Sequence, residues 1–166
     1  MPRKPDRLNY GDTIGIIAPA SAPPDPKNID RSVAVLEQLG FRPRLAANVR
    51  QRWGFLAGSD RDRARDLMQM FTDRRVKAII CVRGGYGTSR FLSRLDYAAI
   101  RANPKVFVGY SDITALSAFF FKECGLVSFY GPMLTSEFAR GASPYTLDSF
   151  KRVLTTDKAS GPLGRP

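Results

Sequence analysis

Short apolar runs alternate along the chain with longer segments whose apolar residues recur at helical spacing. The runs are rich in Ile, Val and Phe and are bounded by Gly, Pro and Asp, a pattern typical of buried β-strands. Four strands are predicted at residues 12–18, 41–46, 76–82 and 105–108, with residues 126–130 as the candidate for a fifth.

The segments between the runs predict helices, and capping residues mark several of their ends. Gly40 stands where a helix ends, Ser59 opens the next helix with acidic residues behind it, and Asp96 caps a further helical turn. Helices are predicted at residues 28–39, 60–71, 88–95, 97–100, 113–123 and 146–154. Phe119, Phe120 and Phe121 make the 113–123 helix apolar on nearly all sides, which predicts that it is buried.

The alternation of strands and helices predicts an α/β fold. We expect a parallel sheet with helices on both faces, of the flavodoxin or Rossmann type. Residues 1–134 are expected to form this domain. Residues 135–166 are expected to add a helix and then a linker, because residues 159–166 are rich in Gly and Pro. In such sheets ligands bind where the strands end, so the turns at the carboxyl ends of the strands are the first place to look for chemistry.

Composition is compatible with one globular domain, because 43% of the 166 residues are hydrophobic and 11% are aromatic. The sequence contains neither an apolar run of membrane length nor a start that resembles a signal peptide, so a cytoplasmic protein that does not enter membranes is expected. Cys81 and Cys124 form no disulfide framework and offer no metal-binding spacing. Cys81 lies among aliphatic residues without a base, which argues against a role as nucleophile.

The formal net charge of +11 fits a nucleic-acid partner, an anionic small substrate, or the basic half of a larger protein. The arginines, however, are scattered along the chain, and many have acidic neighbours, as Arg61 has in Asp60 and Asp62. Scattered charge of this kind usually belongs to a solvated surface, so nucleic-acid binding is disfavoured.

The strand at residues 76–82 runs into a glycine-rich turn, Arg83-Gly84-Gly85-Tyr86-Gly87. Glycines permit backbone conformations closed to other residues and let main-chain N–H groups approach a ligand. Taken alone, the turn is better explained as a tight connection from strand to helix. It lacks the Lys-Ser/Thr ending of a phosphate loop, and Arg90 stands where a Rossmann fingerprint has its last glycine.

The strand at residues 105–108 runs into a second unusual turn, Gly109-Tyr110-Ser111-Asp112. A hydrolase presents its nucleophilic serine on such a turn between a strand and a helix, although Ile113 replaces the last glycine of the usual pattern. The alternative is that Ser111 and Asp112 merely cap the helix that follows. A serine nucleophile also needs a base, and the chain contains no histidine.

The two turns support a common interpretation when they are taken together. In a parallel sheet both emerge at the same edge, which would bring the amides of Gly85 and Asp112 near Ser111 as an oxyanion hole. Arg83 would bind a substrate carboxylate through its planar guanidinium or pair with a surface acid. Tyr86 and Tyr110 would line the cleft or pack beside it.

Six motifs, in preserved order from about residue 11 to residue 133, resemble the serine LD-carboxypeptidases, a family that includes muramoyltetrapeptide carboxypeptidases and microcin C7 immunity peptidases. The motifs are WGFLAG at 53–58, RGGYG at 83–87, LDY at 95–97, NPK at 103–105, GYSDITAL at 109–116 and YGPM at 130–133.

This resemblance implies an enzyme that removes the terminal D-alanine from murein tetrapeptide during cytoplasmic cell-wall recycling, without a metal or other cofactor. It assigns the nucleophile to Ser111 and the oxyanion hole to Asp112 and Gly85. It places Arg83, Gly84, Tyr86 and Tyr110 in or beside the substrate cleft.

The chain departs from the family pattern at its far end. Family members are longer, and their catalytic glutamate and histidine lie in a C-terminal domain that is not found in this sequence. The resemblance therefore implies a truncated, nucleophile-bearing half that is inactive alone and belongs to an enzyme expected to be a homodimer. The alternative is a module that binds an acidic peptide or a nucleotide without catalysis.

Overall fold

The computed structural model describes residues 1–157, and the predicted linker at residues 159–166 lies outside the described residues. Four parallel strands form one sheet in the order β2-β1-β3-β4. They are β1 (Thr13–Ile17), β2 (Arg42–Leu45), β3 (Val76–Cys81) and β4 (Val106–Val108). The α/β fold with a parallel sheet, predicted from the alternating pattern, is confirmed.

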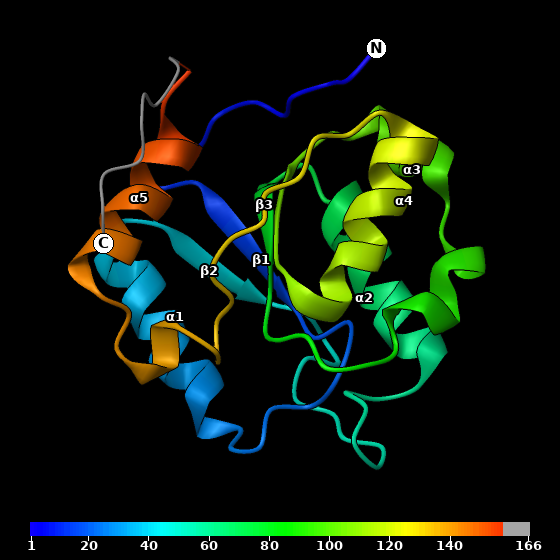
Figure 1. Ribbon diagram of the computed structural model, residues 1–166, viewed down its shortest axis with the longest axis horizontal. Coiled ribbons are helices and arrows are strands. Elements are labelled where there is room, and N and C mark those ends of the chain that lie inside the picture. The colour runs from blue at the N-terminus through cyan, green and yellow to red at the C-terminus, as the bar shows by residue number, and fades with distance from the viewer. Residues whose placement is uncertain (158–166) are drawn as a thin grey trace.

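Helices cover both faces of the sheet (Figure 1). On one side lie α1 (Lys27–Gln38) and α5 (Pro144–Thr155), and on the other lie α2 (Asp60–Thr72), α3 (Tyr97–Ala102) and α4 (Thr114–Cys124). A 3₁₀ helix, η1 (Thr88–Arg94), follows β3, and shorter 3₁₀ turns lie at Ser111–Ile113 and Phe138–Arg140. None of the helices in residues 1–157 is both long enough and apolar enough to span a bilayer.

Aromatic packing joins the sheet to the α2 and α4 layer. The Phe107 ring of β4 lies 5.0 Å from the ring of Phe120, which in turn lies 5.2 Å from Phe71 of α2. On β1, α2 approaches so closely that a Cβ at Gly15 would lie 2.8 Å from Met70 Sδ. Burial of these rings and of the aliphatic strand residues supplies the main stabilising free energy of the domain.

The predicted caps are confirmed where the helices begin. Ser59 Oγ accepts a hydrogen bond from the amide of Asp62 at 3.1 Å, and the Asp96 carboxylate accepts one from the amide of Ala99 at 2.9 Å. Each bond satisfies an N–H that has no partner inside its helix.

Two sequence-based expectations are wrong. Residues 126–130 form only isolated bridges, one from Leu126 to Arg3 and one from Phe129 to Val108, and therefore not a fifth strand. Helix α4 is not buried on nearly all sides, because Phe121 is 54% exposed while Phe120 is fully buried. The spacing of apolar residues along a helix does not indicate whether the protein covers one side of the helix or all of them.

Lys105 is a buried cation at the amino-terminal edge of the sheet. Its ammonium donates hydrogen bonds to the carbonyls of Asp73 at 2.6 Å and Val76 at 2.5 Å, and so joins the end of α2 to the start of β3. Burial of the charge lowers the pKa of Lys105 to about 8. Between pH 8 and the ordinary lysine pKa, the unfolded chain therefore binds more protons than the folded one, and stability contributed by this group rises with pH.

We expect urea denaturation between pH 7 and pH 10 to show this rise in stability for the wild type but not for the Lys105→Met variant. The free energy of unfolding of the wild type, relative to the variant, should increase by about 1 to 3 kcal/mol over this range. Lys4→Met, a change at an exposed lysine, should leave the pH dependence as it is. A flat difference between the wild type and Lys105→Met would contradict the assignment.

Candidate active site

The sheet order β2-β1-β3-β4 places a topological switch point between β1 and β3. The chain leaves β1 toward one face and leaves β3 toward the other, and loops that separate in this way create the usual ligand-binding position in open parallel sheets. The glycine-rich turn follows β3, and the serine turn follows the neighbouring strand β4. Both turns therefore emerge at the same edge of the sheet, as the sequence predicted.

Ser111 has a left-handed backbone, with φ of +62°, and is the one non-glycine residue with positive φ in residues 1–157. This conformation costs a non-glycine residue on the order of 1–3 kcal/mol and is found mainly where function requires it. The side chain is exposed, and the chain continues through a 3₁₀ turn into α4. This is the geometry of a serine held out of a strand-to-helix turn.

Gly84 brings the two turns into contact. A Cβ built on Gly84 would lie 2.9 Å from Ser111 Cβ, 3.1 Å from Ser111 Oγ and 3.3 Å from the amide nitrogen of Asp112. Contacts this short leave no room for a side chain. The absence of a side chain on Gly84 therefore keeps the space around the Ser111 hydroxyl open from this side.

The amides of Gly85 and Asp112 are unoccupied hydrogen-bond donors. Within residues 1–157, neither N–H has a protein acceptor. The Asp112 amide lies at the start of a 3₁₀ turn, where N–H groups have no partner inside the helix. Gly85 has φ of +115°, so the loop geometry here depends on glycine. Both donors are free to bind a negatively charged oxygen.

Thr88, which the sequence did not single out, holds Asp112 in place. The fully buried Thr88 hydroxyl lies 2.7 Å from the Asp112 carbonyl oxygen and 2.9 Å from its carboxylate, which also accepts from the Thr88 amide at 3.0 Å. The Asp112 carboxylate is thus engaged in fixing the turn. In the sequence, Thr88 is visible only as a threonine after a glycine-rich turn. Capping of the following helix is the ordinary explanation for a threonine at such a position.

Ser21 was also missed, and it holds the glycine-rich turn. Its amide donates to the Gly84 carbonyl at 3.3 Å, and its Oγ accepts from the Tyr86 amide at 3.2 Å. A Cβ on Gly85 would lie only 2.3 Å from Ser21 Oγ. Ser21 comes from the proline-rich loop after β1, and nothing in the local sequence connects it with residues 84–86.

Arg63 of α2 is the buried cation that joins three of the surrounding loops. Its guanidinium donates to the carbonyls of Pro19 at 2.6 Å, Gly87 at 2.8 Å and Gly58 at 3.3 Å, and it pairs with Asp60. It also lies 5.1 Å from the centre of the Phe91 ring. A single planar group with several donors can satisfy these carbonyls together, which a lysine cannot do with the same geometry.

We expect Arg63→Met to lower the free energy of unfolding by about 2 to 3 kcal/mol, because it leaves buried carbonyls without donors. Urea denaturation measures this loss. Arg65→Met is the matched control on the same helix, since Arg65 is 49% exposed and, within residues 1–157, is bonded only to Asp62 at 2.8 Å. Exposed ion pairs contribute little, so the control should change stability by less than about 0.5 kcal/mol. Equal losses in the two variants would contradict the role given to Arg63.

Arg83 and the two tyrosines lie around the same edge. The guanidinium of Arg83, half-buried, donates to the Ala22 carbonyl at 3.5 Å and has no carboxylate partner within residues 1–157, so the predicted pairing with a surface acid is not seen in this part of the chain. Tyr86 is 49% exposed, with its ring 5.8 Å from that of Phe55. The Tyr110 hydroxyl donates to Glu137 at 2.7 Å, which raises the pKa of Tyr110.

The thiol of Cys81 lies elsewhere, in the core of β3. It is fully buried, and burial raises the pKa of this thiol well above its usual value. A neutral buried thiol is a poor nucleophile, which agrees with the sequence-based argument against Cys81.

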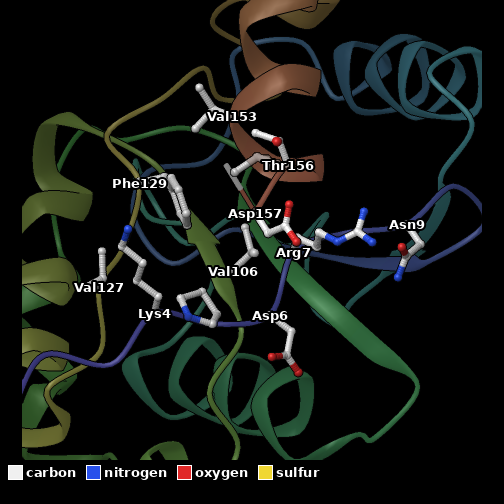
Figure 2. A pocket seen from close by; sticks show the side chains of 12 residues that line it. Lys4, Asp6, Arg7, Asn9, Val106, Val127, Phe129, Val153, Thr156 and Asp157 are labelled. Atoms are coloured by element: carbon white, nitrogen blue, oxygen red, sulfur yellow. The ribbon is translucent and has the colours of Figure 1, made fainter. Parts of the chain in front are cut away.

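A hollow lies at the opposite edge of the sheet (Figure 2). This cavity of about 800 Å³ has Lys4, Asp6 and Arg7 of the N-terminal segment on one side, with Val106 of β4 and Phe129 among its apolar lining. It contains none of the residues of the two turns, and the amino-terminal edge is not where open parallel sheets bind their ligands.

Ser111 is exposed and precedes the free amide of Asp112, and no histidine lies near it in residues 1–157. The chain has no histidine, and Asp112, the nearest carboxylate in sequence, is bonded to Thr88. The geometry suits attack by an activated serine on a carbonyl carbon, with the activating group supplied from outside these residues.

Comparison with known proteins agrees with this geometry. Residues 14–131 match the family model described as the LD-carboxypeptidase N-terminal domain. The chain is 46% identical over 151 residues to a probable murein peptide carboxypeptidase of Bacillus subtilis strain 168, an alignment that covers 90% of this chain and 47% of that protein.

Two solved structures have the same fold. The MccF-like protein of Bacillus anthracis str. Ames superposes with a TM-score of 0.88 at 37% identity, covering 93% of this chain and 47% of that one. The muramoyltetrapeptide carboxypeptidase of Oxalobacter formigenes gives a TM-score of 0.79 at 38% identity, covering 87% and 48%. The chain thus spans about half the length of the relatives it matches. Its sequence, its fold and its two turns together show that this chain belongs to the LD-carboxypeptidase family, as an N-terminal domain.

Proposed function

We propose that this chain is the nucleophile-bearing half of a serine LD-carboxypeptidase that removes the terminal D-alanine from murein tetrapeptide. The observation that carries the proposal is the strained backbone of Ser111, which sits against the Gly84 backbone and beside the free amide of Asp112. A nucleophile held in a strained turn next to an unoccupied hydrogen-bond donor suits acyl transfer, in which the donor stabilises the oxyanion.

In this mechanism, Ser111 Oγ attacks the carbonyl carbon of the peptide bond that precedes D-alanine. A base takes the hydroxyl proton, and the amides of Gly85 and Asp112 stabilise the negative charge on the tetrahedral oxygen. The bond to nitrogen then breaks, the base returns the proton to the amine, and D-alanine leaves. Water hydrolyses the remaining ester on Ser111 by the same steps.

Substrate binding is assigned to the residues around the nucleophile. Gly84 leaves space for the scissile bond, the free donors of Arg83 can hold a peptide carboxylate, and Tyr86 and Tyr110 flank the cleft. The net charge of +11 favours a peptide rich in carboxylates. The proposal includes a cytoplasmic location, a role in peptidoglycan recycling and a homodimeric intact enzyme.

The base is assigned to a glutamate and a histidine in the second half of the protein. This assignment rests on the resemblance to the family and is supported by relatives about twice as long as the chain. The chain alone is then expected to be inactive, because removal of the base eliminates most of the catalysis that a triad provides.

The decisive experiment measures D-alanine release from murein tetrapeptide. A protein that joins residues 1–166 to the second half should release D-alanine, and the same protein with its candidate histidine changed to alanine should not. Tight binding of the peptide by the joined protein without any release would favour a non-catalytic binding module instead. Neither binding nor release would reject murein peptide as the ligand.

A further inference from the structure

We propose that Ser21 and Thr88 are positioning residues that hold the two amides of the oxyanion hole. This inference rests on the proposed function, since it concerns the same site, but it is carried by contacts that the nucleophile assignment does not use. The two donors come from different loops, and a charge-stabilising pair works only when both are held at a fixed position before the reaction.

Ser21 holds the Gly85 donor from both sides. Its amide bonds the carbonyl of the preceding residue, Gly84, at 3.3 Å, and its Oγ accepts from the amide of the following residue, Tyr86, at 3.2 Å. The amide of Gly85 itself takes no part and has no acceptor within residues 1–157. Ser21 is only 9% exposed, so water competes little for these bonds.

Thr88 holds the Asp112 donor from the opposite side of the turn. Its buried hydroxyl lies within hydrogen-bond distance of the Asp112 carbonyl and carboxylate, at 2.7 and 2.9 Å. These contacts fix the carbonyl and the side chain of Asp112 and leave its amide unoccupied in the described part of the chain. They also stabilise the turn in which Ser111 keeps its positive φ.

The hydrogen bonds of Ser21 and those of Thr88 have the same consequence. Each hydroxyl satisfies the polar groups beside an oxyanion donor without occupying the donor itself. Loss of either hydroxyl should therefore move a donor by a few tenths of an ångström, which weakens stabilisation of the transition state more than binding of the substrate.

The test compares Thr88→Val, which removes the hydroxyl at nearly constant volume, with Thr88→Ser, which keeps it. In the protein joined to its second half, Thr88→Val and Ser21→Ala should each lower kcat about 10-fold or more with KM changed by less than about twofold. Thr88→Ser should restore most of the activity. Affinity for a boronic-acid analogue of the substrate should fall by the same factor as kcat.

Matched controls separate positioning from general stability. Thr135 donates to the Val82 carbonyl at 3.1 Å and Ser32 to the Leu134 carbonyl at 2.9 Å, both from buried hydroxyls whose partners lie outside the two turns. Thr135→Val and Ser32→Ala should leave kcat within about twofold. Equal losses of kcat in the controls and the test variants would overturn the proposal, as would unchanged kcat and boronate affinity in the test variants.

A second readout does not need activity. In the 166-residue chain, the ¹⁵N amide signals of Gly85 and Asp112 should broaden by exchange in Ser21→Ala and Thr88→Val respectively, and remain sharp in the controls. If the joined wild type releases no D-alanine, the proposed function fails while this measurement still tests the positioning. Sharp signals in both variants would show that the hydroxyls do not hold the donors.

Discussion

Replacing Ser111 by alanine in the joined protein is expected to lower kcat for D-alanine release at least about 10⁴-fold. The change removes the attacking oxygen, and the Thr88 hydroxyl cannot take its place, since it is buried and bonded to Asp112. KM should change little, because the hydroxyl contributes more to the transition state than to binding. Initial rates over a range of substrate concentrations measure both quantities.

Ser117→Ala is the control for this prediction. Ser117 lies on α4, six positions beyond Ser111, and its replacement should leave kcat within about twofold. The prediction fails if Ser111→Ala retains more than about a tenth of the wild-type activity. In that case the strained turn would serve binding rather than nucleophilic attack.

Gly84→Ala is expected to lower kcat about 100-fold or more while the protein stays folded. The added methyl would lie 2.9 Å from Ser111 Cβ and 3.1 Å from its Oγ, so the serine must move. A displacement of about 1 Å at a reacting group costs on the order of 100-fold. Gly84 does not have the positive φ that would strain an alanine, so we expect stability to fall by only about 1 kcal/mol.

Gly131→Ala provides a control in which the added methyl meets a single neighbouring side chain and not Ser111. A Cβ there would lie 3.1 Å from Val108 Cγ1, and Gly131 likewise has no positive φ. Its loss of stability should resemble that of Gly84→Ala, as measured by urea denaturation, while kcat stays within about threefold. If both variants lose the same activity, the effect of Gly84 is one of packing and not of access to Ser111.

The sequence was sufficient to locate the two turns and the edge where they meet. Residues 76–82 and 105–108 are apolar enough to require burial as strands, and parallel strands place the turns that follow them at one edge of the sheet. The placement of Ser111, Gly84, Gly85 and Asp112 follows from this simple rule. Their catalytic roles stay predictions.

The sequence was not sufficient to find the groups that hold these turns. Ser21 and Tyr86 lie 65 positions apart, Thr88 and Asp112 lie 24 apart, and Arg63 contacts a carbonyl 44 positions away. Such contacts depend on how loops fold against one another, and no local pattern of polar residues encodes them. The same limit explains residues 126–130, whose β-rich composition could not indicate that the ladder stops at isolated bridges.

The contacts that hold the serine turn determine how much of the chain must be synthesised before the turn can fold. Ser21, Gly84 and Thr88 precede the serine turn in the sequence, whereas Phe129 and Glu137, which bond to Gly109 and Tyr110, follow it. All of these partners lie within residues 1–157, so under the proposed function Ser111 would reach its final geometry before a base from a later segment is synthesised. A nascent chain of the proposed enzyme would then carry Ser111 in its final backbone conformation before it could attack neighbouring peptides.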